Sequence, residues 1–194
     1  MISTLSKKIT NTLIHKNSIS KDDRELYEYG FFMLLSNLYF TVITCLFGLI
    51  FGVFFESIVF FVSFMLIRKY AGGFHAKTEA QCQIFSTVSI FLSILIIRYV
   101  NLEKMSVLFL VLTAIASVLI FAFAPLDTPE KPLDTKEKNY FKKISYIILT
   151  ILDILFVVAY LLKWNGIFIA VSVAILFESI LITLGKISRI KRKN

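Results

Sequence analysis

The sequence has little charge for a chain of its length. Only 18% of its 194 residues are Asp, Glu, Lys or Arg, whereas 57% are hydrophobic, and the mean hydropathy is +0.79. A soluble domain of this size would have to expose much of that apolar surface to water, so the composition predicts an integral membrane protein. We predict an all-α polytopic bundle of membrane helices that forms one domain over residues 1–194.

Cysteine and proline are also scarce. The two cysteines, Cys45 and Cys82, do not suggest a disulfide framework, and Cys45 lies in the middle of an apolar segment. The first twenty residues contain no compact apolar run followed by small residues, so we expect no cleavable signal peptide. All three prolines fall in residues 125–143, where we expect a cytoplasmic loop and the only extended non-helical stretch.

Long apolar segments predict about six membrane spans. Residues 31–67 contain one charged residue, Glu56, and at ~1.5 Å per residue they are long enough for two crossings. Gly48 and Gly52 offer the turn between these first two spans. Residues 84–184 hold four further apolar runs and supply the remaining spans.

Both ends of the chain are basic and flank the spans. Residues 1–20 place apolar side chains at helical spacing with lysines off that stripe, which predicts a helix lying in the membrane surface. Arg24 and Glu28 follow with the spacing of an ion pair on one helix face. Residues 185–194 form a basic tail, as expected of a topology and lipid-anchoring signal.

The distribution of basic residues predicts the orientation. If the N-terminus is cytoplasmic, 18 of the 21 Lys and Arg residues fall in the expected cytoplasmic segments. This excess predicts a multi-pass protein of the cell membrane with both termini in the cytoplasm. The net charge of +8 is then explained by an anionic phospholipid membrane, and we expect no nucleic acid partner.

Residues 68–83 form a polar island between apolar runs, on the expected cytoplasmic side. The island holds Cys82 and His75, which are seven residues apart. On a straight helix their rise would be ~10.5 Å, too far for proton transfer, so a working pair needs a broken helix. Gly72 and Gly73 favour such a break, and Thr78 has the pattern of a cap for a new helix.

These residue types make up the parts of a cysteine nucleophile site. A thiol near a helix start feels partial positive charge, which favours the thiolate, and His75 would act as its partner or base. Arg68 would stabilise an oxyanion or bind a substrate carboxylate, and Lys77 adds positive charge. By itself, the pattern of a His and a Cys seven residues apart more often indicates a structural role than catalysis. A metal is disfavoured because only these two ligands are close in sequence, and we expect no cofactor.

The island resembles the accessory gene regulator protein B (AgrB) family, the membrane endopeptidases of Gram-positive quorum sensing. The residues that match the family pattern, with its spacing, are Arg68, Gly72-Gly73, His75-Ala76, Cys82 and Ser86. The chain length and the number of apolar segments agree with the family as well. The resemblance implies that Cys82 is the catalytic cysteine and His75 the catalytic histidine. It also implies that Arg68 and Gly73 are needed for activity.

The resemblance further implies an AgrD-like precursor peptide as the substrate and partner. The enzyme would cleave off its C-terminal tail, hold the remainder as a thioester and promote closure of a thiolactone or lactone ring. The sequence leaves open whether His75 and Cys82 act within one chain or across a homodimer. The alternative is a non-enzymatic exporter of a small peptide, with the intramembrane acids Asp153 and Glu178 in its path.

Overall fold

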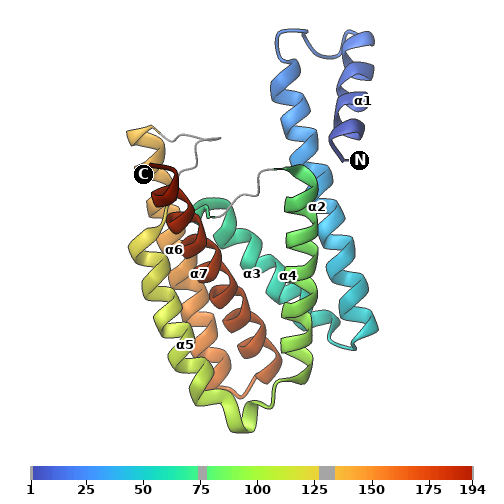
Figure 1. Cartoon of the computed structure of the whole chain (residues 1–194). Coiled ribbons are helices and arrows are strands. Elements are labelled where there is room, and N and C mark those ends of the chain that lie inside the picture. The colour runs from blue at the N-terminus through green and yellow to red at the C-terminus, as the bar shows by residue number, and fades with distance from the viewer. Residues whose placement is uncertain (1, 74–77, 127–133, 194) are drawn as a thin grey trace. The chain divides into compact units, whose positions relative to one another are not determined.

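The described part of the chain is helical, as predicted. A computed structural model describes residues 2–73, 78–126 and 134–193, and the regular elements in these ranges are all helices (Figure 1). This confirms the all-α fold class. The helices are α1 (Ile2–His15), α2 (Arg24–Ile50), α3 (Phe54–Ala71), α4 (Glu79–Tyr99), α5 (Leu102–Phe123), α6 (Thr135–Leu161) and α7 (Asn165–Lys193).

Five of these helices are long and apolar enough to cross a membrane. They are α2, α4, α5, α6 and α7, which supports a polytopic membrane protein but falls one short of the expected six spans. The other two helices are α1 and α3, and α3 forms where the second span was expected. Its 18 residues include Glu56 in the first turn and Arg68 and Lys69 in the last turn. With 18 residues, α3 is too short to hold an 18-residue stretch with fewer than these three charges, whereas the other five helices have at least 20 residues.

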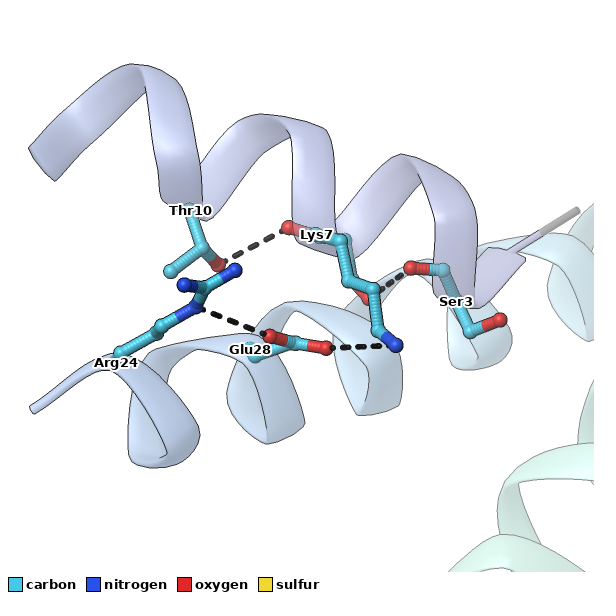
Figure 2. A network of polar contacts seen from close by, with 6 residues as sticks. Ser3, Lys7, Thr10, Arg24 and Glu28 are labelled. Carbon is cyan, nitrogen blue, oxygen red and sulfur yellow. Dashed lines mark hydrogen bonds and ion pairs between the residues drawn. The ribbon is translucent and has the colours of Figure 1, made fainter. Parts of the chain in front are cut away.

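The chain divides into two compact units, Met1–Ile43 and Thr44–Asn194. In the first unit α1 buries Ser6 and Thr10, whose hydroxyls donate to the carbonyls of Ser3 and Ser6. Glu28 of α2 lies 3.6 Å from Lys7 and 3.8 Å from Arg24 (Figure 2). The structure therefore confirms the expected Arg24–Glu28 pair and adds Lys7 of α1 to it.

Helix α7 is the centre of the second unit. It contacts α3, α4, α5 and α6, and its eight residues 168–175 are all buried (Figure 1). A helix that is buried on every side has no polar face to present, which explains this uninterrupted run of small and apolar side chains. Ser172 of α7 shares a hydrogen bond with Thr113 of α5, and such polar contacts between helices are common in membrane bundles.

Two boundaries differ from the sequence expectation. The non-helical stretch was expected to reach Lys143, but α6 begins at Thr135 because Asp134 and Glu137 form a capping box. The basic tail was separated from the last span, but α7 continues through it to Lys193. Lysine and arginine are good helix formers, and positive charge is favourable at a helix C-terminus.

Candidate functional site

The polar island begins where α3 ends, at two glycines in conformations that other residues avoid. Gly72 has φ of 77° and Gly73 has φ of 135°. The Gly72 N–H donates to the carbonyl of Arg68 at 3.3 Å and so closes the last turn of α3. Left-handed backbone is accessible to glycine at little cost, which explains why the helix breaks here, as the sequence predicted.

The glycine turn is held against the segment that follows α5. The Leu126 N–H donates to the Ala71 carbonyl at 2.8 Å, and Gly72 and Leu126 form an isolated parallel bridge. A Cβ at position 72 would collide with the Leu126 carbonyl oxygen. The first residues of the expected proline-rich loop therefore adjoin the polar island, a contact between segments more than fifty residues apart.

Arg68 folds back over this turn from the last turn of α3. Its Nη1 donates to the Gly72 carbonyl at 2.8 Å and lies 3.9 Å from Oε1 of Glu178. A Cβ at position 73 would collide with the same nitrogen. Nη1 of Arg68 is thus engaged with the chain's own groups, and the expected binding of a substrate carboxylate or an oxyanion stays a prediction. This arrangement favours a positioning role for Arg68.

Glu178 of α7 is a functional candidate, and the sequence did not identify the residue that pairs with it. Its side chain is fully buried, and the ion pair with Arg68 links α7 to the end of α3. From the sequence, Lys163 or Lys186 is an adequate partner for some of the acids in or near the spans. The structure instead has the Lys186 ammonium 3.5 Å from the ring centroid of Phe123. A buried acid needs a counter-charge, but sequence alone did not identify which one.

Cys82 lies in the first turn of α4, as the capping pattern predicted. The Thr78 hydroxyl accepts from the Gln81 N–H at 3.2 Å, and the Cys82 N–H donates to the Thr78 carbonyl at 3.0 Å. The Cys82 thiol is free and half-buried. The cap therefore uses one of the N–H groups that have no helical partner at this helix start, that of Gln81.

His75 and Lys77 lie outside the described residues, so their expected roles stay predictions. Within the described ranges, no group of three or more His, Cys, Asp or Glu side chains is placed to hold a metal ion. Asp153, the other acid of the exporter hypothesis, accepts a hydrogen bond from Ser117 at 2.7 Å. Asp153 and Glu178 thus each have a structural partner, which weakens the reason to place them in a transport path.

Comparison with known proteins adds a family assignment to this geometry. The family model described as accessory gene regulator B matches residues 6–182. An AgrB-like protein of Clostridium perfringens is 29% identical over 86% of this chain and 80% of its own length. Accessory gene regulator protein B of Staphylococcus haemolyticus is 32% identical over 74% of this chain and 75% of its own length. No solved structure matches.

Proposed function

Because the chain belongs to the accessory gene regulator B family of quorum-sensing systems, we propose that it is a membrane cysteine endopeptidase. Its substrate in this proposal is an AgrD-like precursor peptide. The observation that carries the proposal is the free, half-buried thiol of Cys82 in the first turn of α4. A thiol at a helix start is in the environment that activates cysteine nucleophiles. Cys45, in contrast, lies within the apolar α2.

The proposed reaction has two acyl transfers. Cys82 gives its thiol proton to His75, and its sulfur attacks the carbonyl carbon at the junction with the C-terminal tail. The bond to the tail nitrogen breaks, and the tail leaves as an amine that takes this proton from His75. An internal thiol (or hydroxyl) of the peptide then attacks the resulting thioester and gives its proton to His75. The ring closes, and Cys82 is regenerated as the thiol. A thioester conserves the acyl activation, so ring closure competes with hydrolysis wherever water is excluded.

We further propose that this site faces the cytoplasm. Contacts gather the basic helix ends of the second unit: Ala71 with Leu126, Phe123 with Lys186, and Tyr70 with Phe141. These contacts join the end of α3, the end of α5, the start of α6 and the end of α7. Lys69, Lys142 and Lys143 lie in the same helix ends, as the positive-inside rule requires of a cytoplasmic face.

Labelling with a membrane-impermeant maleimide tests this orientation. In a Cys45→Ala background, we expect Cys82 to be modified in inverted membrane vesicles and to stay unmodified in intact cells, because the reagent reaches only one face. A mass measurement of the protein detects the adduct. Modification of Cys82 in intact cells would show that the site faces outward.

Trapping the acyl-enzyme tests the proposed chemistry. We expect membranes that contain the protein and an AgrD-like peptide to yield a covalent adduct on Cys82, with the mass of the peptide minus its tail. Neutral hydroxylamine should release this adduct, because it cleaves thioesters, and the free tail should accumulate in step with it. Mass spectrometry of both products is the measurement. Tail release that persists after Cys82 has been fully alkylated would contradict the proposal.

A further inference from the structure

The buried carboxyl of Glu178 is not explained by packing. Neither of its oxygens has a hydrogen-bond partner among the described residues, and the side chain has no exposed surface. Its neighbours along α7 at Ala174, Ile175, Leu181 and Ile182 are buried apolar residues. A charged group in such a place is costly unless a counter-charge meets it. The counter-charge that the structure provides is Arg68, at 3.9 Å.

Arg68 connects this carboxyl to the glycine turn. One of its nitrogens, Nη1, both donates to the Gly72 carbonyl and lies nearest to Glu178. The same nitrogen occupies the space beside Gly73 that a side chain would need. A guanidinium has five donors in a rigid plane, so it can serve a carboxylate and a carbonyl together. The guanidinium of Arg68 thus contacts both the Glu178 carboxyl and the glycine turn, so a change at Glu178 is transmitted to the turn.

The position of this turn matters for the nucleophile. Only residues 74–77 separate Gly73 from Thr78, the cap of the helix that carries Cys82. Because an extended chain spans at most about 3.6 Å per residue, this short connection keeps the Gly72–Gly73 turn near the start of α4. We propose that Glu178 is a positioning residue. It acts through Arg68 to fix the position of the Gly72–Gly73 turn relative to the helix start that carries Cys82. This inference rests on the proposed peptidase function.

Glu178→Gln is the direct test, with Asp153→Asn as the matched control. Asp153 is also an intramembrane acid, but it lies on α6 and accepts a hydrogen bond from Ser117. For Glu178→Gln we expect kcat for tail release to fall about 100-fold, because small displacements of reacting groups cost rates of that order. KM for the peptide should stay unchanged, since Glu178 is fully buried and has no surface for the peptide to contact. Asp153→Asn should retain the wild-type kcat.

A purely structural role would not produce this pattern. It would lower the amount of folded protein without changing kcat per active site, measured by titrating Cys82 with an alkylating agent. Hydrogen exchange gives an independent reading, since loss of the pair should speed exchange of the amides in residues 68–73 and leave α5 unchanged. Glu178→Asp, which keeps the charge, should recover part of kcat. Unchanged kcat or unchanged exchange in Glu178→Gln would overturn the inference.

A second variant covers the case in which Glu178→Gln fails to fold. Replacing both partners, Arg68→Met with Glu178→Met, removes the buried pair without leaving one charge alone, and such replacements are often neutral for stability. We expect this double variant to fold and to show faster exchange of the amides in residues 68–73, whereas wild-type exchange there or a wild-type kcat would overturn the inference. If the wild-type protein itself releases no tail, the proposed function fails, and the exchange measurement alone decides whether Glu178 holds the turn.

Discussion

Cys82→Ala is expected to abolish release of the peptide tail, whereas Cys45→Ala leaves it intact. Without the sulfur no thioester forms, and removal of a covalent nucleophile typically costs a factor on the order of 10⁴ or more in kcat. Cys45 is the matched control, because it is the other free cysteine and lies within α2. Mass measurement of the released tail, normalised to the amount of folded protein, decides the outcome. A Cys82→Ala variant that still trims the peptide would exclude Cys82 as the nucleophile.

The Cys82→Ser variant sharpens this result. A serine hydroxyl needs a stronger base than a thiol, so we expect far slower tail release than in the wild type. Any acyl adduct that forms would be an oxygen ester, which neutral hydroxylamine cleaves much more slowly than a thioester. An adduct in this variant that is released as readily as in the wild type would place the acyl group on a different residue.

The helices and their caps follow from local sequence. Apolar runs predicted where α2 to α7 lie, and Thr78 predicted the start of α4, because a cap depends on residues three or four positions apart. The start of α6 was expected too late because the three prolines favour a loop, whereas Asp134 and Glu137, which follow them, cap a helix. Five helices, one fewer than the expected spans, are long and apolar enough to cross a membrane, because the 18 residues of α3 include three charged residues.

Contacts between distant segments could not be predicted in this way. The two glycines indicated a broken helix, but nothing local to them indicates that Leu126 would pair with Ala71. Likewise the sequence offers Lys163 or Lys186 as partners for the intramembrane acids, and only the packing of α3 against α7 brings Arg68 to Glu178. The chemistry of the nucleophile could be read from residue types, whereas the groups that position it depend on tertiary structure.

A comparison of Gly72→Ala with Gly52→Ala tests whether the contact of the glycine turn with Leu126 positions the site. Gly52, between α2 and α3, has φ of 68°, and a Cβ there would meet no atom within 4 Å. Gly72 has φ of 77°, and its Cβ would collide with the Leu126 carbonyl. Gly52→Ala therefore introduces only the strain of a left-handed backbone, which lowers the free energy of unfolding by about 1 to 2 kcal/mol. Gly72, with ψ of −151°, lies in a backbone region that is essentially restricted to glycine, so Gly72→Ala strains the backbone more and must also displace Leu126 or the turn.

We therefore expect Gly72→Ala to lose far more activity than Gly52→Ala. Overpacking adds about 1 to 3 kcal/mol to the loss of stability, and a displaced turn misplaces the segment that leads to Cys82, so kcat should fall about 100-fold or more. Gly52→Ala should lower the midpoint of thermal unfolding in detergent while its kcat stays near that of the wild type. Both quantities should be measured on the same preparations. Equal effects of the two substitutions on kcat would mean that the contact of Gly72 with Leu126 does not position the site.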